Sequence, residues 1–186
     1  DKEHLRDGLQ KMSPESRYRR FLSATTTLSE AALRYLTEVD GWNHVAVVAL
    51  ERKADGSEEG LGVARFVRAS DDPHAAEAAV TVLDAVQGQG LGRLLLAALT
   101  VGAVERGINV FRGELLSSNK PVMELMKELD PGLTIRVDGT ITRIEARLPT
   151  EVPRPDDLEA LRHAPANQLL RLAARGVEFK SPMPGH

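Results

Sequence analysis

The sequence Glu-Ala-Ala-Val-Thr-Val-Leu-Asp-Ala-Val-Gln-Gly-Gln-Gly-Leu-Gly-Arg-Leu-Leu-Leu, residues 77–96, decides the fold of this chain. Its first part, with Val80 and Val82, is short and apolar, which indicates a buried β-strand. From Leu91 onwards the apolar residues recur at helical spacing, which predicts an amphipathic helix. The predicted inner stripe of this helix consists of Leu91, Leu94, Leu95, Ala98 and Gly102.

The glycine-rich turn between this strand and this helix is a candidate anion-binding site. Backbone N–H groups at the start of a helix have no partner inside the helix, and the helix dipole adds positive charge there. A P-loop would require Lys-Ser or Lys-Thr after its last glycine, but Arg93 and Leu94 follow Gly92. A dinucleotide fingerprint that began at Gly88 would require glycine at position 93. The simplest alternative is a glycine-rich turn that binds no ligand.

The spacing that the turn does satisfy is Gln87-x-x-Gly90-x-Gly92, with a strand before it and a helix after it. This pattern resembles the pyrophosphate-binding signature of the GNAT superfamily of acyl-CoA-dependent N-acyltransferases. The resemblance extends from about residue 9 to residue 148. Within the superfamily, segments such as 13–16 and 76–80 are similar to bacterial protein-lysine acetyltransferases. The resemblance implies an α+β fold, with a mixed, mostly antiparallel sheet that has helices on both faces, and acetyl-CoA as cosubstrate.

The other segments predict the helices and hairpins of such a domain over residues 1–150. We expect a loosely held lead-in at residues 1–12, and a first helix that brings Tyr18, Phe21 and Leu22 towards the core. The expected helices besides the one at Leu91 are residues 14–23, 29–38 and 119–129. The expected strands besides the one at Glu77 are residues 44–50, 61–68, 108–116, 133–137 and 141–148. Residues 151–186 are expected to form a helical tail packed on the domain.

Composition limits the function in several ways. The chain has 186 residues, of which 42% are hydrophobic and 27% are charged, as in an ordinary globular domain. It has no cysteine, which excludes disulfides, zinc–thiolate sites and a cysteine nucleophile. A net charge of −3 and 4% aromatic residues give no basic or stacking surface for nucleic acid or membrane. No pair of histidines has metal-ligand spacing with a third ligand, so we expect no metal. No apolar run reaches transmembrane length and residues 1–20 are too charged for a secretory signal, so we expect a cytoplasmic location.

Acetyl transfer to an amine requires a base, because a free lysine amine has a pKa near ~10.4 and is protonated at neutral pH. Glu77 is our candidate base. It is an acid in an otherwise apolar strand, and it matches the catalytic glutamate of the lysine acetyltransferases that the chain resembles. The alternative is a structural ion pair between Glu77 and Arg65 or Arg68. Glu114, near the C-terminal end of the next expected strand, is the second candidate base.

The resemblance also implies which residues contact acetyl-CoA. The backbone amides expected to bind the pyrophosphate are those of Gln87, Gly88, Gln89, Gly90, Leu91, Gly92 and Arg93, and the Arg93 side chain is an additional cation. The main chain of Val80 and Val82 would pair with pantetheine, and the Val82 amide would bind the oxyanion. Asn119 would face the pantetheine arm; its alternative role is to cap a helix. Many relatives have a tyrosine acid in this helix, but residues 122–126 contain none.

Three functions are compatible with these residues. The first is acetyl transfer from acetyl-CoA to a lysine side chain of a protein, by direct attack. The second is the same reaction on a small amine, and the third is a catalytically silent acyl-CoA-binding module. The candidate base Glu77 argues against the third function, and the helical opening at residues 13–40 favours the first over the second. We expect a monomer or a homodimer.

Overall fold

The computed structural model describes residues 2–21, 29–150 and 177–180. Its helices are α1 (Lys2–Lys11), α2 (Pro14–Phe21), α3 (Glu30–Thr37), the 3-10 helix η1 (Asp84–Val86), α4 (Leu91–Val104) and α5 (Lys120–Leu129). Its strands are β1 (His44–Arg52), β2 (Glu58–Arg68), β3 (Ala75–Val82), β4 (Val110–Leu116), β5 (Thr134–Asp138), β6 (Ile141–Arg147) and β7 (Val177–Lys180).

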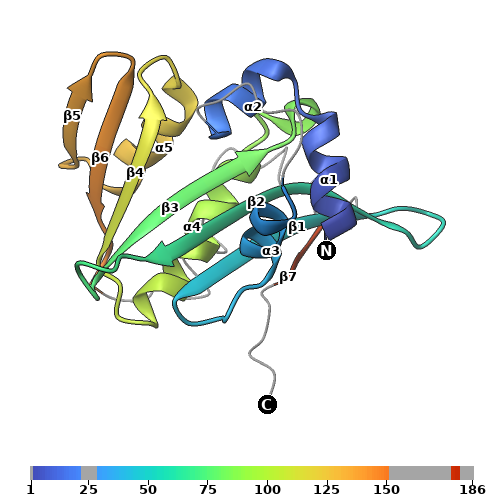
Figure 1. Cartoon of the computed structure of the whole chain (residues 1–186), viewed down its shortest axis with the longest axis horizontal. Coiled ribbons are helices and arrows are strands. Elements are labelled where there is room, and N and C mark those ends of the chain that lie inside the picture. Colours follow the sequence, from blue (N-terminus) through green and yellow to red (C-terminus); the bar gives the residue numbers. More distant parts are fainter. Residues whose placement is uncertain (1, 22–28, 151–176, 181–186) are drawn as a thin grey trace.

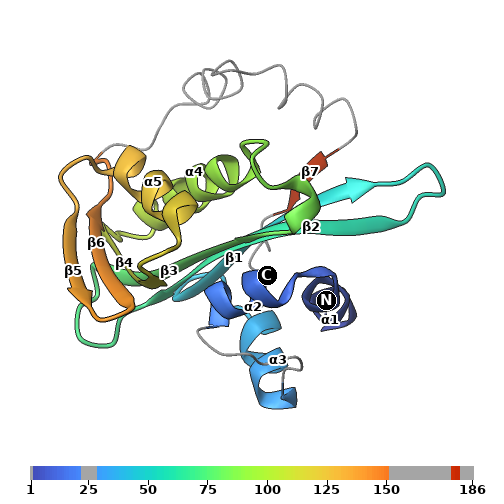
Figure 2. The same ribbon diagram turned by 90° about the horizontal axis from the view of Figure 1, so that it is seen from above.

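The strands form one seven-stranded sheet in the order β5-β6-β4-β3-β2-β1-β7 (Figure 1). Among the described strands, only β3 and β4 pair in parallel, and every other neighbouring pair is antiparallel. Helices α4 and α5 cover one face of the sheet, and α1, α2 and α3 lie on the other (Figure 2). The predicted α+β class, with a mixed and mostly antiparallel sheet between helices, is therefore confirmed.

The core lies between the sheet and α4. Leu91, Leu95 and Leu99 of α4 are almost completely buried and pack in one cluster with Phe66 and Phe111 of the sheet. The predicted inner stripe was partly wrong in phase. Leu96, Leu99 and Ala103 are buried, whereas Leu94, Ala98 and Gly102 are only partly buried. Three consecutive leucines at 94–96 fit either phase, so the sequence pattern alone did not fix the rotation of the helix.

The N-terminal segment differs from the expectation of a loose lead-in, because residues 2–11 form helix α1. The helix ends next to Met12, whose side chain is 7% exposed. Lys11 forms an ion pair with Glu59 of β2, and Glu59 also binds Lys53 at 2.6 Å. Hydrogen bonds and charges from these two lysines lower the pKa of Glu59 to about 2. Charged contacts that sequence periodicity does not reveal therefore fix α1 against the β1–β2 hairpin.

Three further expectations about the ends of the domain have different outcomes. The helix expected at residues 29–38 is α3, and Ser29 is its N-cap, because the Ser29 hydroxyl accepts the Ala32 N–H at 3.1 Å. Tyr18 was expected in the core, but its side chain is 45% exposed on the outer side of α2. The expected tail helices, and the side chains of Phe21 and Leu22, lie outside the described residues. Val177–Lys180 instead forms β7, an unpredicted strand antiparallel to β1.

Strands β3 and β4 part shortly after they meet. Their parallel pairing includes only Ala75–Glu77 of β3 and Val110–Arg112 of β4, and Figure 1 shows the two strands diverging beyond it. On its other side, β3 stays paired with β2 as far as Val82. Among the described strands, none therefore pairs with this edge of residues 78–82 in the middle of the sheet, and such an edge needs another hydrogen-bonding partner.

Gly62 of β2 allows a tight approach to this part of β3, which gives the first testable prediction. A Cβ at position 62 would lie 2.8 Å from the Thr81 carbonyl oxygen and 2.9 Å from Leu95 Cδ1. Gly62→Ala should therefore lower the free energy of unfolding by about 1–3 kcal/mol in a denaturant titration. Gly60→Ala is the matched control, because nothing lies within 4 Å of its added Cβ. Equal stabilities of the two variants would contradict the prediction.

Candidate acyl-CoA site

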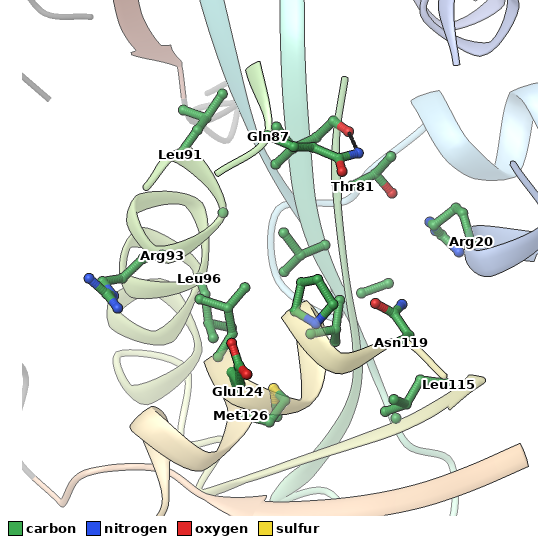
Figure 3. Close-up of a pocket in the computed structure, with 18 of the residues that line it drawn as sticks. Arg20, Thr81, Gln87, Leu91, Arg93, Leu96, Leu115, Asn119, Glu124 and Met126 are labelled. Atoms are coloured by element: carbon green, nitrogen blue, oxygen red, sulfur yellow. Dashed lines mark hydrogen bonds between the residues drawn. The ribbon is translucent and has the colours of Figure 1, made fainter. Parts of the chain in front are cut away.

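A cleft of about 620 Å³ opens where β3 and β4 part. Its walls come from β3, the glycine-rich turn, α4, β4 and α5, with Ile144 of β6, and α2 contributes from the other face of the sheet (Figure 3). The sequence-predicted residues that line it are Val80, Val82, Gln87, Gly88, Gln89, Gly90, Leu91, Gly92, Arg93, Asn119 and Glu114. The fold thus brings the continuous segment 80–93 together with Glu114 of β4 and Asn119 at the start of α5, which come later in the chain.

The glycine-rich turn has the geometry of an anion site. Gly88 and Gly90 have φ angles of +71° and +84°, a region that side chains disfavour. Gly90 is the N-cap of α4 and provides no capping side chain. The first N–H groups of α4 therefore remain available at the cleft wall. A Cβ on Gly92 would lie 3.3 Å from Leu125 Cδ1, so this glycine allows α4 and α5 to approach closely.

The open edge of β3 directs main-chain groups into the cleft. The Leu83 N–H donates to the Leu61 carbonyl of β2 at 2.9 Å. Since backbone groups of successive strand residues alternate between the two neighbours, those of Val82 and Val80 point away from β2. The Gln87 side chain agrees with this direction, because its Nε2 donates to the Val82 carbonyl oxygen at 3.0 Å. The N–H groups of Val80 and Val82 are therefore positioned to pair with an extended ligand.

Asn119 and Arg93 stand on opposite sides of the cleft. Asn119 is at the N-cap position of α5 but makes no side-chain capping bond, and its side chain is buried at the cleft wall. Arg93 Nε and Nη2 donate to both carboxylate oxygens of Glu128 of α5 at 2.8 and 2.6 Å. These bonds raise the pKa of Arg93. The guanidinium lies on the side of α4 away from Gln87 and Thr81 (Figure 3), so its charge is directed at α5.

Glu77 lies on the face of the sheet that carries α2, in register with Arg112 of β4. It was expected to be an acid held in an apolar environment, but the residue is exposed, because none of the described helices covers this part of the strand. It does not line the cleft; Ala79, two residues further on the same face, does. Its side chain makes no hydrogen bond or ion pair with any side chain that the structure describes.

The charged residues near Glu77 have other partners. Arg65 lies 3.5 Å from His44 Nε2, and Arg68 binds Asn43 Oδ1 at 3.0 Å and the Arg106 carbonyl at 2.9 Å. Neither arginine is directed to Glu77 by these contacts. Glu114 does line the cleft, but its carboxylate accepts a hydrogen bond from Arg143 Nε at 2.7 Å. Of the two candidate bases, Glu77 is thus the one without a cationic partner among the described side chains.

A hydrogen-bond network that the sequence did not predict joins the turn to α2. Asp84 Oδ2 accepts the Ser13 backbone N–H at 2.7 Å, and Asp84 Oδ1 accepts the Ser16 hydroxyl. Gln87 Nε2 also donates to Asp84 Oδ1 at 3.1 Å. Burial alone would raise the pKa of Asp84, but the bonds from Ser16 and Ser13 outweigh it and lower the pKa. The sequence signal was weak, because Asp84 resembles an ordinary turn residue.

Other kinds of site are not evident in the described ranges. Within residues 2–21, 29–150 and 177–180, no three His, Cys, Asp or Glu side chains gather as metal ligands. None of the described helices is both long and apolar enough to span a membrane.

A mixed sheet whose central strands part over a glycine-rich helix start is the architecture of an acyl-CoA-dependent N-acyltransferase. A family model for the acetyltransferase (GNAT) family matches residues 11–130. Acetyltransferase Pat of Mycolicibacterium smegmatis is 33% identical over 167 residues, which cover 88% of this chain and 49% of that protein. An acetyltransferase of Pseudomonas aeruginosa is 30% identical over 125 residues, which cover 67% of this chain and 66% of that protein. The chain belongs to the GNAT acetyltransferase family.

Solved structures agree with this assignment. The GNAT domain of S. lividans PAT superposes with a TM-score of 0.66 and 29% identity, covering 80% of this chain and 85% of that domain. A cAMP-binding acyltransferase from Mycobacterium smegmatis has a TM-score of 0.54 and 32% identity, over 86% of this chain and 49% of that protein. The chain thus spans about half the length of the mycobacterial relatives, and about two thirds of the Pseudomonas acetyltransferase.

Proposed function

We propose that this chain transfers an acetyl group from acetyl-CoA to the side-chain amine of a protein lysine. The observation that carries the proposal is the parting of β3 and β4. It leaves an open backbone edge with the glycine-rich turn at one end and Glu77 at the other. A ligand in this gap can be held by main-chain groups, while its reactive end reaches the face of the sheet where an acceptor can approach.

The geometry of the cleft supports a set of cofactor contacts. The N–H groups of residues 88–93 bind the pyrophosphate, because the start of α4 has no capping side chain and carries the positive end of the helix dipole. The main chain of Val80 and Val82 pairs with the amides of pantetheine as an added strand would. The Asn119 side chain provides a further polar contact. An acetyltransferase from Salmonella typhimurium with a similar fold, at 22% identity, has been solved with acetyl-CoA as its cofactor.

The chemistry is direct attack within a ternary complex. The lysine nitrogen attacks the thioester carbonyl carbon, the C–N bond forms, and the C–S bond breaks with its electron pair going to sulfur. Before the attack, Glu77 accepts one proton of the lysine ammonium, through water because its carboxylate stands back from the cleft lining, and the second proton leaves the nitrogen for solvent after the C–N bond has formed. The Val82 N–H stabilises the oxyanion. A thiol with a pKa near ~8.5 leaves acceptably as thiolate, which agrees with the absence of tyrosine from α5.

The protein acceptor is supported by the segments at 13–16 and 76–80, which resemble bacterial lysine acetyltransferases. The test is incubation of the purified chain with labelled acetyl-CoA and, separately, a lysine peptide, a peptide with only its α-amine free, and a small polyamine. We expect the label on the lysine Nε, located by mass spectrometry. Label on the polyamine alone would support the small-amine function. Acetyl-CoA binding without transfer to any amine would support a silent binding module.

A further inference from the structure

Helix α2 forms the part of the cleft wall that lies on the acceptor face of the sheet. Ser16 and Arg20 are one turn apart on one side of α2, and both line the cleft. In Figure 3, Arg20 lies across the cleft from Arg93, on the far side of β3. An acceptor that enters from this face must therefore pass α2. The position of α2 accordingly bears on acceptor binding more directly than on cofactor binding.

A helix as short as α2 depends on outside contacts for its position. It has 8 residues, Pro14–Phe21, and isolated helices shorter than ~12 residues are marginal in water. The Asp84 carboxylate supplies such contacts at the start of the helix, where it binds the Ser13 N–H and the Ser16 hydroxyl. Asp84 comes after Leu83, which follows the last residue of β3, so it connects α2 to the strand that borders the gap.

The Asp84 carboxylate also contacts a residue of the proposed cofactor site, Gln87. Gln87 Nε2 donates to Asp84 Oδ1 at 3.1 Å and to the Val82 carbonyl at 3.0 Å, and it lies 3.5 Å from the Ser16 hydroxyl. Gln87 is the first residue of the predicted pyrophosphate signature. The Gln87 side chain, which belongs to the glycine-rich turn, thus contacts both α2 and the carbonyl of Val82, the residue whose N–H is the proposed oxyanion donor.

We infer that Asp84 is a positioning residue for the acceptor: it fixes α2, and with it the wall formed by Ser16 and Arg20, at a set distance from the open edge of β3. The inference rests on the proposed function, because it requires an amine acceptor that enters past α2. A carboxylate suits the role because each of its oxygens accepts from a different donor. An asparagine would present its NH2 group either to the Ser13 N–H or to the Gln87 Nε2 group, neither of which can accept, so one bond is lost and a repulsive contact remains.

The test compares Asp84→Asn with Asp55→Asn. Asp55 is the matched control, because it also accepts from a backbone N–H and a hydroxyl, those of Ser57 at 2.9 and 2.6 Å, but at the tip of the β1–β2 hairpin. Steady-state kinetics should show a roughly 10–100-fold rise in the lysine-peptide KM for Asp84→Asn, the range expected for losing a hydrogen bond to a charged group. Its acetyl-CoA Kd and kcat should change less than about threefold, and Asp55→Asn should match wild type.

Ser16→Ala tests the positioning role of Asp84 independently, because it removes one donor to the carboxylate and leaves Asp84 intact. It should raise the peptide KM by a smaller factor, and the double variant should be no worse than Asp84→Asn alone, since both changes act through one contact. An unchanged peptide KM in both single variants would overturn the positioning role, as would an acetyl-CoA Kd that rises by the same factor. A wild-type chain that acetylates no amine overturns the proposed function, and this inference with it.

Discussion

Acetyl-CoA should no longer bind measurably when Gly90 is replaced by glutamate. Gly90 has a φ of +84° at the start of α4, where a side chain is strained and a carboxylate would stand beside the pyrophosphate. Two like charges about 4 Å apart near a protein surface repel by about 4 kcal/mol. Binding should therefore weaken by about 10³-fold, since each 1.4 kcal/mol is tenfold in affinity. Isothermal titration calorimetry with acetyl-CoA measures this directly.

Gly56→Glu separates the effect of charge at the turn from that of backbone strain. Gly56 has a nearly identical φ of +83°, nothing lies within 4 Å of an added Cβ, and it sits in the turn between β1 and β2. The control variant should lose some stability and keep its acetyl-CoA affinity. A folded Gly90→Glu variant that binds acetyl-CoA as wild type does would mean that the turn is not the pyrophosphate site, and the proposed enzyme would lose its main support.

Glu77→Gln keeps the shape of the side chain and removes the proton acceptor. General-base catalysis contributes about 10²–10⁴-fold, or roughly 3–5 kcal/mol of barrier, so kcat should fall by that factor. Acetyl-CoA affinity should stay near wild type, because the glycine-rich turn lies at the other end of the gap. The loss should shrink as pH rises towards the amine pKa of ~10.4, since more acceptor is then already deprotonated. Single-turnover rates over a pH series measure the effect.

Glu114→Gln is the natural comparison, because Glu114 points to the same face and lines the cleft but is held by Arg143. We expect a smaller effect on kcat from this change. Near-normal turnover of a stable Glu77→Gln enzyme, combined with a large loss in Glu114→Gln, would transfer the role of base to Glu114. If both variants keep turnover, ordered water alone accepts the proton.

The sequence predicted the local parts of the site well, because each depends on residues close together along the chain. The glycines at 88–92 predicted the turn, and the leucines after them predicted α4, since turn geometry and helical periodicity are local properties. The strands expected at 133–137 and 141–148 flank Asp138-Gly139, a pair typical of two-residue hairpins, and β5 and β6 do pair there, with Gly139 at a φ of +60°.

Features that depend on contacts between distant segments were not predictable in this way. No local pattern shows that β3 and β4 pair over only three residues, or that Asp84 reaches Ser13 and Ser16 at the start of α2. Glu77 was expected to be buried because its neighbours are apolar, but side chains alternate across a strand, and its face of the sheet is open here. The exposure of a strand residue depends on which helix covers that face, and this is a tertiary property.

The short parallel pairing of β3 with β4 also affects the lifetime of the folded protein in a cell. A sheet interrupted at its centre has unpaired backbone groups where most proteins have a continuous ladder, and a bound acyl-CoA would supply the missing partners. A ligand that binds only the folded chain adds about 2.7 kcal/mol of stability at 100 times its dissociation constant. Abundance of the folded protein would then follow the supply of acyl-CoA, so that starvation for the cosubstrate reduces the amount of enzyme as well as its rate.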